Sequence, residues 1–289
     1  MFKTPDGEAA YVAAYHAALA QWPVPCRTLR VPTRYGLTHV VACGSETGEP
    51  LVLLHAAGTS STVWMQNIGA LSETYRIFLI DIPGDPNLSE PSAPFRSRSD
   101  CTAWLSDVLD GLKIDRPHLG GISYGGWQAL NYALAVPDRL KSLMLFAPAA
   151  SLAKFRLAFF LHFIGPMLVP TRKMVHRTFR WLVAPGHAFP QWLEELMFLA
   201  VKHYRFTKGG IFPSVYPDEE LRSLRVPTLL LLGEHEVIYD PKQALDRATR
   251  LIPSLRAELI PGAGHVLIME QPEIVNGLIT DFLAATRAN

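Results

Sequence analysis

A serine flanked by glycines stands near the middle of the chain, in the segment G-G-I-S-Y-G-G, where Gly121 and Gly125 lie two residues to either side of Ser123. The apolar run at residues 118–122 precedes the serine, and a helical pattern at residues 127–136 follows it. This arrangement is typical of a strand that turns sharply into a helix, because only glycine leaves room for so tight a turn. In such a turn the serine hydroxyl stands above the sheet, and the amides at the helix start point at developing negative charge.

The motif alone is weak evidence for a nucleophile. Glycine makes up about 7% of residues in average proteins, so G-x-S-x-G arises by chance in roughly one chain in ten of this size. A glycine-rich turn that carries a surface serine is the alternative interpretation. The other segments must decide whether Ser123 has the partners that nucleophilic chemistry requires.

The composition excludes several classes of protein. The 289 residues are 49% hydrophobic and 18% charged, which favours a sizeable folded core over disorder. The formal net charge is +1, which argues against nucleic acid as the main partner. The longest apolar run, residues 155–169, is interrupted by Arg156, His162 and a Gly-Pro pair, so we expect no membrane span.

Cysteine usage and the first residues bear on the compartment. The three cysteines are far apart and in no metal-binding or redox spacing, which fits a reducing environment. The first residues are polar and lack the basic start and apolar run of a signal peptide. We therefore expect a cytoplasmic protein. The sequence leaves its oligomeric state open, with a homodimer as one alternative.

Short apolar runs alternate with helical patterns through most of the chain. The runs that we expect to be strands are residues 27–31, 38–42, 51–54, 76–80, 118–122, 140–146, 228–232 and 257–260. The helical patterns are residues 8–21, 62–71, 99–112, 127–136, 241–251 and 272–286. Such alternation predicts an α/β fold with a mostly parallel central sheet, and the first two strands form an antiparallel N-terminal edge. Ser99 or Asp100 is the expected N-cap of the helix at residues 99–112.

One long segment departs from this alternation. Residues 151–225 are helical in pattern, rich in aromatic residues and interrupted by prolines. Insertions of this kind sit at the carboxyl ends of parallel strands, where open α/β sheets bind ligands. We therefore predict a core domain made of residues 1–150 and 226–289, and a helical cap, or lid, made of residues 151–225.

A serine nucleophile needs a base, and His265 is the best candidate. It follows Gly262, Ala263 and Gly264 in a loop between a predicted strand and a predicted helix. Such a loop can place an imidazole over a neighbouring strand end. A loop histidine that caps the closing helix is the alternative interpretation.

The base needs a carboxylate that fixes its tautomer, and the loop after residues 228–232 offers three. Asp240 precedes Pro241, so helix capping already accounts for it. Glu234 follows the strand directly, whereas Glu236 sits at the crest of the turn and is our choice. The order Ser123, Glu236, His265 is the chain order in which a serine nucleophile, its acid and its base follow one another in this kind of fold.

Two backbone amides are candidates for an oxyanion hole. One is the amide of Tyr124, directly after the nucleophile. The other lies in the H-A-A-G loop after residues 51–54, where Ala57 is our choice and Ala56 the alternative. His55 then supports the loop. Taken alone, this segment is better explained as a small-residue loop without function.

Two charged segments have simpler interpretations. Residues 81–91 are acidic, but no spacing there fits a calcium or zinc site, so we expect a structural loop and no metal. Residues 171–180 are basic and could bind anions or a membrane surface. We interpret this run as the solvated face of a helix.

These segments together resemble the α/β-hydrolase superfamily over nearly the whole chain. The stretches LLHAAGTSSTVW, DIPGDPNLSEP and LLLLGEHEVIYDP are especially similar to capped bacterial carboxylesterases of the naproxen-esterase group of bacilli. The resemblance implies an ester hydrolase that uses Ser123, Glu236 and His265. The chain departs from the common pattern in having Ala56 in place of glycine, glutamate in place of aspartate at 236, and Asp85 where many relatives have histidine.

The sequence therefore predicts a serine carboxylesterase for small to medium, largely apolar esters, acting through an acyl-enzyme and without a metal or organic cofactor. The predicted cap is rich in aromatic residues, namely Phe155, Phe159, Phe160, Phe163, Trp181, Trp192 and Phe198. They indicate an apolar substrate, and packing within the core of the cap would account for them equally well. Alternatives with the same residues are a carbon–carbon bond hydrolase, a lactonase, a peptidase or a perhydrolase. A further alternative is a non-catalytic protein that binds a small ligand. Serine at position 123 argues against chemistry that uses an aspartate nucleophile.

Overall fold

The computed structural model describes residues 1–206 and 211–287. In this part of the chain nine strands form a single sheet. The strands are β1 (Cys26–Thr33), β2 (Gly36–Gly44), β3 (Glu49–Leu54), β4 (Tyr75–Ile80), β5 (Glu90–Pro91), β6 (His118–Ile122), β7 (Ser142–Phe146), β8 (Thr228–Gly233) and β9 (Leu255–Ile260).

The order of the strands across the sheet is β1-β2-β4-β3-β6-β7-β8-β9, and β5 pairs with β2. The six strands from β4 to β9 along this path are parallel to one another. β1 and β2 are antiparallel to their neighbours. Every residue of β6, β7 and β8 is buried, because helices cover both faces of the parallel strands. The predicted parallel sheet with an antiparallel N-terminal edge is confirmed.

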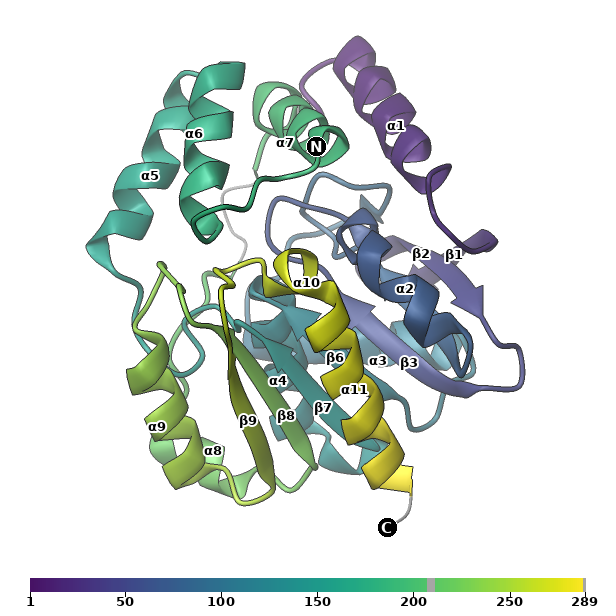
Figure 1. Cartoon of the computed structure of the whole chain (residues 1–289). Coiled ribbons are helices and arrows are strands. Elements are labelled where there is room, and N and C mark those ends of the chain that lie inside the picture. Colours follow the sequence, from purple (N-terminus) through teal and green to yellow (C-terminus); the bar gives the residue numbers. More distant parts are fainter. Residues whose placement is uncertain (207–210, 288–289) are drawn as a thin grey trace.

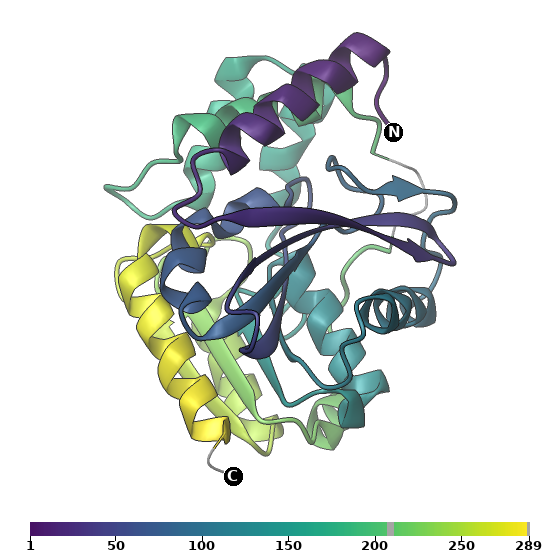
Figure 2. The ribbon, with the colours of Figure 1, turned by 90° about the vertical axis from the view of Figure 1, so that its right-hand side faces the viewer.

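Helices cover both faces of the sheet and extend beyond its edge. In chain order, the α-helices of the described residues are α1 (Pro5–Leu19), α2 (Met65–Ser72), α3 (Arg98–Gly111), α4 (Tyr124–Ala135), α5 (Leu157–Leu168), α6 (Arg172–Leu182), α7 (Gln191–His203), α8 (Asp218–Ser223), α9 (Pro241–Leu251), α10 (Leu267–Glu270) and α11 (Pro272–Arg287). α2 and α11 lie side by side on one face, and α3 and α4 lie on the other (Figures 1 and 2). Among the described residues, no helix combines the length and the apolar character needed to cross a membrane.

The start of α3 differs from the sequence prediction. Its N-cap is Ser97 rather than Ser99 or Asp100, and the Ser97 side chain accepts a hydrogen bond from the amide of Asp100. Asp100 accepts in return from the amide of Ser97, which completes a capping box. The prediction was wrong because several cap-forming residues follow one another here, and only the helix phase selects among them.

The segment between β7 and β8 carries helices away from the sheet. α5, α6 and α7 form a layer beyond the carboxyl ends of the strands, with α1 beside α7 (Figure 1). The N-terminus is tied to the end of α7, since the amide of Lys3 donates to the carbonyl of His203 at 2.7 Å. α8 instead packs against α4 and α9 on the sheet. That residues 151–225 act as one cap remains a prediction.

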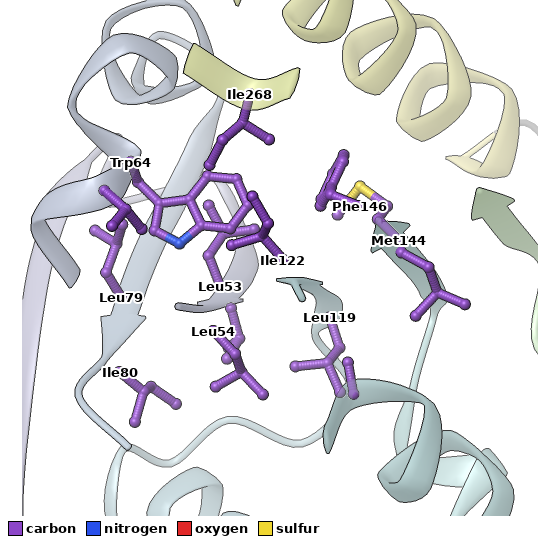
Figure 3. Packing of buried hydrophobic residues seen from close by; sticks show 14 of the residues in the cluster. Leu53, Leu54, Trp64, Leu79, Ile80, Leu119, Ile122, Met144, Phe146 and Ile268 are labelled. Carbon is purple, nitrogen blue, oxygen red and sulfur yellow. The ribbon is translucent and has the colours of Figure 1, made fainter. Parts of the chain in front are cut away.

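Apolar side chains fill the space below this layer. Trp64 lies against Phe146 with its ring edge to face, the ring centroids being 5.5 Å apart. Figure 3 shows Trp64 and Ile268 beside Leu53 and Ile122, which come from the central strands β3 and β6. All of these residues are buried, so the ends of the central strands rest on a packed core. This packing fixes the position of the loops that follow the strands.

Candidate active site

Ser123 occupies the turn between β6 and α4 in a strained conformation. Its φ is +53° and its ψ is −114°, a region that residues with a side chain rarely adopt. Its amide donates to the carbonyl of Phe146 at 2.9 Å. Its own carbonyl accepts from the amides of Trp127 and Ala149 at 3.0 and 2.9 Å. The surrounding backbone therefore holds Ser123 in a conformation that it would not choose alone.

The flanking glycines are required by sterics. A Cβ on Gly125 would lie 2.5 Å from the carbonyl oxygen of Leu54 and 2.6 Å from that of His55. A Cβ on Gly121 would overlap the backbone of Gly125. The G-x-S-x-G spacing thus lets the turn pack against itself and against the end of β3.

His265 lies next to the serine. Its Nε2 is 2.9 Å from the Ser123 Oγ, and the ring is almost completely buried. The loop that carries it follows β9 and leads into α10. The backbone amide of His265 donates to the carbonyl of Leu182 at 2.8 Å, at the end of α6. The base candidate is therefore held from both the sheet and the helical layer.

Glu236 faces the other nitrogen of His265. Its Oε2 is 2.7 Å from Nδ1, and its Oε1 accepts from the amide of Ile238 at 2.9 Å. A carboxylate at Nδ1 favours the tautomer with the proton there, which leaves Nε2 free to accept the proton of Ser123. The Glu236 side chain is fully buried, so water does not compete for the imidazole.

The two rival carboxylates have other partners. Asp240 accepts from the amides of Lys242 and Gln243, both at 3.0 Å, and so caps α9. Glu234 accepts from the amide of Gly262 at 3.0 Å on the exposed side of the turn. The structure thus brings Ser123, His265 and Glu236 together, while their catalytic roles remain predictions.

The loop after β3 lies beside the serine. Ala56 and Ala57 both line a cavity together with Ser123 and Tyr124. The amide of the next residue, Gly58, already donates to a carboxylate, which leaves the two alanines as oxyanion candidates in this loop. The assignment of Ala57 and Tyr124 as oxyanion donors stays a prediction.

His55 sets the course of this loop. Its Nδ1 lies 2.8 Å from the carbonyl of Ala56, and its Nε2 accepts from the amide of Ile82 at 2.8 Å. A nitrogen that faces a carbonyl must carry the proton, so His55 is in the Nδ1–H tautomer. Its side chain is buried and fully engaged, consistent with the supporting role that we expected from the sequence.

The cavity above Ser123 has a volume of about 640 Å³. Its floor contains Ser123 and His265, and its wall is largely apolar. α5, α6 and α7 supply part of this wall, and loop residues such as 56–59, 83–85, 91–95 and 211–213 supply much of the rest. Four of the aromatic residues singled out in the sequence line it: Phe155, Phe159, Phe160 and Phe163. Trp181 instead stacks on His162, with ring centroids 4.1 Å apart, and Phe198 lies below the guanidinium of Arg172. Within the described residues, Trp192 is not part of the cavity lining either.

Asp85 is a cavity residue that the sequence did not place there. Its Oδ1 accepts from the amide of Gly58 at 2.8 Å, next to the oxyanion candidates. Burial raises the pKa of this carboxyl to about 6, although His55 and the Gly58 amide oppose the shift. The only signal in the sequence was that aspartate stands at position 85 where many relatives have histidine. That difference did not show that the side chain faces the cavity.

Glu270 is a second residue that sequence reasoning missed. Its Oε1 accepts from the amide of Ala184 at 2.6 Å, and its Oε2 accepts from the amide of Gly264 at 2.9 Å. It therefore joins the end of α6 to the loop that carries His265. Burial raises the pKa of this carboxyl, with the two amides opposing the shift. No spacing in the sequence could reveal a bridge between segments so far apart.

Asp81, at the start of the acidic segment after β4, supports the structure of the neighbouring loop. Asp81 is buried and accepts from the amide and hydroxyl of Ser61 at 2.8 and 2.7 Å. Burial raises its pKa, but hydrogen bonds from His39 and Ser61 hold the net value below the usual range. In the described part of the chain, no group of three or more His, Cys, Asp or Glu residues is arranged to hold a metal ion.

Comparison with known proteins shows the family of this chain. The model of the alpha/beta hydrolase family matches residues 51–278, which is most of the chain. The chain belongs to this family. Its relatives include an uncharacterized carboxylesterase, nap, of Bacillus subtilis (strain 168), which is 40% identical over 97% of this chain and 94% of the relative.

Further relatives agree with this result. The carboxylesterase YbfK of the same organism is 34% identical over 94% of this chain and 93% of its own length. Among solved structures, the naproxen esterase (carboxylesterase NP) of Bacillus subtilis superposes with a TM-score of 0.92 at 40% identity, covering 97% of this chain and 99% of that one. The resemblance stated from the sequence is therefore confirmed, and this α/β-hydrolase is a hydrolytic enzyme as predicted.

Proposed function

We propose that this α/β-hydrolase is a serine carboxylesterase that works through Ser123, His265 and Glu236. The observation that carries the proposal is the hydrogen-bonded series from Ser123 Oγ to His265 Nε2, at 2.9 Å, and from His265 Nδ1 to Glu236 Oε2, at 2.7 Å. Relatives named carboxylesterases, at 40% and 34% identity, support the reaction class.

The first half of the reaction forms an acyl-enzyme. Ser123 Oγ attacks the ester carbonyl carbon while His265 Nε2 accepts the hydroxyl proton. The carbonyl oxygen becomes an oxyanion, which the amides of Tyr124 and Ala57 stabilise by hydrogen bonds. The tetrahedral intermediate then collapses as the bond to the alcohol breaks, and His265 donates its proton to the leaving alkoxide.

The second half returns the enzyme to its starting state. Water attacks the acyl carbon while His265 Nε2 accepts one of its protons. Collapse of the second intermediate releases the carboxylic acid, and the proton on His265 returns to Ser123 Oγ. Glu236 orients the imidazole and stabilises its charged form throughout, without itself taking the proton.

The cavity supports esters that are small to medium in size and largely apolar. We propose that residues 151–225 act as the cap, since many residues of this segment, nearly all of them apolar, line the cavity that contains Ser123. Apolar walls bind acyl or alcohol groups mainly through the hydrophobic effect, which places few geometric demands on the substrate. A broad substrate range therefore follows from this proposal.

Hydrolysis of p-nitrophenyl butyrate by the wild type and by Ser123→Ala tests the reaction. We expect kcat to fall by about 10⁶-fold, because the remaining groups cannot replace the nucleophile. A fluorophosphonate should label the wild type once, at Ser123, as peptide mass spectrometry would show. Ser92→Ala is the matched control, since Ser92 also lines the cavity but has no histidine partner there.

Equal rates in the wild type and Ser123→Ala would refute the proposal. Activity lost in Ser92→Ala but kept in Ser123→Ala would move the nucleophile. A wild type that binds the ester but neither hydrolyses it nor is labelled by the fluorophosphonate would support the alternative of a ligand-binding protein.

A further inference from the structure

Helix α5 carries an unusually apolar outer face. Its sequence, LAFFLHFIGPML, contains no Asp, Glu, Lys or Arg. Seven of the eleven exposed large hydrophobic side chains in the described residues lie between residues 157 and 169. Leu157, Leu161 and Leu168 are 73%, 65% and 76% exposed. Monomeric soluble proteins rarely expose contiguous apolar patches of this kind without a binding partner.

A stripe of cations lies on the neighbouring helix. Lys173, Arg177 and Arg180 follow one another at helical spacing on α6, and all three are exposed. The buried residues Val175, Phe179 and Leu182 lie on the other side of the same helix. Among the residues that the structure describes, no acidic side chain pairs with any of these three cations. This stripe is thus a positive surface without internal compensation.

α5 and α6 are in contact at His162. The Thr178 hydroxyl donates to the carbonyl of His162 at 2.9 Å, and the ring of Trp181 stacks on that of His162. Figure 1 shows the two helices side by side at the edge of the helical layer. The apolar face of α5 and the cationic stripe of α6 therefore belong to one outer surface.

This surface continues into the cavity. Phe160, Ile164 and Met167 of α5 are 41%, 54% and 63% exposed and also line the cavity above Ser123. These three residues form a rim of the cavity, where the outer surface of α5 and the cavity wall are both apolar. An apolar molecule that reaches the rim can pass into the cavity without crossing a polar barrier.

We propose that α5 and α6 form a docking surface for an anionic lipid membrane, from which apolar esters enter the cavity. Apolar side chains beside unpaired Lys and Arg residues are the composition of helices that lie in a membrane interface. Each cation near an anionic surface strengthens binding by about fivefold. A two-fold dimer through the same face would bring the unpaired cations of both copies toward one another, which disfavours a second copy as the occupant.

Flotation with phosphatidylcholine vesicles, with and without phosphatidylglycerol, tests the surface. The wild type should bind the vesicles that contain phosphatidylglycerol, and binding should weaken at about 1 M salt, where the Debye length is about 3 Å. The double variant Leu161→Glu, Leu168→Glu should lose binding to both kinds of vesicle. Lys173→Ala, Arg177→Ala should lose roughly 25-fold in binding to anionic vesicles, with little change on neutral ones.

Two control variants test whether vesicle binding depends on α5 and α6 in particular. Ile274→Glu charges an exposed apolar residue on α11, and Arg27→Ala removes an exposed cation on β1. Both should bind vesicles as the wild type does. Leu161 and Leu168 do not line the cavity, so hydrolysis of a water-soluble ester should be unchanged in their variant and report correct folding.

Two results would overturn the proposal. One is a wild type that fails to float with anionic vesicles. The other is a wild-type dimer in light scattering that Leu161→Glu, Leu168→Glu converts to a monomer without any vesicle binding, which would assign the face to a second copy. Repeating the flotation with Ser123→Ala separates this proposal from the esterase proposal, since membrane binding needs no nucleophile.

Discussion

The two walls of the cavity are built in different ways. On the sheet side, Ser123 and the side chains of His265 and Glu236 each have directional partners at 2.7 to 3.0 Å. On the helix side, α5 and the residues just before it contribute stacked and tilted phenylalanine rings, such as Phe155 and Phe159 with centroids 4.4 Å apart. Hydrogen bonds fix distances, whereas apolar contacts tolerate rearrangement. The hydrogen-bonded side chains on the sheet side are therefore held rigidly, whereas the apolar wall on the helix side is free to rearrange.

After the loss expected for Ser123→Ala, the largest expected effect on the sheet side comes from Glu236. Glu236→Gln should lower kcat by about 10⁴-fold, because an amide at Nδ1 stabilises the wrong tautomer and cannot stabilise the imidazolium. Asp240→Asn is the matched control and should leave kcat nearly unchanged, since asparagine also caps a helix well. Steady-state kinetics with p-nitrophenyl butyrate measures both. A larger loss in Asp240→Asn would move the role of the acid to that residue.

A second effect on the sheet side is steric. Gly125→Ala should lower the free energy of unfolding by about 3 kcal/mol, since its Cβ would press on the carbonyl oxygens of Leu54 and His55. Gly277→Ala on α11 is the control, because its Cβ would meet no atom within 4 Å. It should leave stability unchanged or raise it by about 0.5 kcal/mol. Urea unfolding of the two variants compares them, and equal stabilities would contradict the tight fit of the turn.

Asp85 lines the cavity, and its carboxyl should make the free energy of unfolding depend on pH. Folding raises its pKa from 3.8 to about 6, so the folded state holds this proton more tightly than the unfolded chain. Its contribution is fully present below pH 3.8 and is lost as the pH rises through about 6, by at most about 3 kcal/mol. Asp85→Asn should therefore stabilise the protein at pH 8 more than at pH 4.5. Urea midpoints that shift equally at both pH values would show that the carboxyl titrates normally.

The smallest effect is expected on the outside of the helix side. Leu157→Ser on α5 should change stability by less than about 0.5 kcal/mol, because the side chain is 73% exposed. Leu54→Ala, in the buried end of β3, should cost about 3 kcal/mol in the same urea measurement. A large cost for Leu157→Ser would mean that α5 is covered in solution and would weaken the contrast between the two walls.

The sequence predicted the sheet side well because short-range rules govern it. The glycines around Ser123 are dictated by backbone sterics, and the order of Ser123, Glu236 and His265 follows from the order of the strands. Buried parallel strands are recognisable in the sequence as short apolar runs, as in β3 and β8.

The missed features depend on contacts between distant segments. Asp85 reaches the cavity only because the loop after β4 folds back on Gly58, and Glu270 joins residues on α10 and after α6. Which aromatic residues face the cavity depends on the rotation of α5, α6 and α7 about their axes. An apolar sequence without charges gives no periodic signal that fixes this rotation.

The contact between the His265 loop and the end of α6 has a consequence for protein engineering. The amide of His265 donates to Leu182, Glu270 bridges Gly264 and Ala184, and a Cβ on Gly264 would lie 2.6 Å from the carbonyl oxygen of Leu182. A chimera that takes α5 to α7 from a relative must therefore inherit this backbone junction with matching geometry. Crossovers placed at residues 156 and 180 would leave the junction native, and would let α5 and most of α6 be exchanged together as a cassette without moving His265.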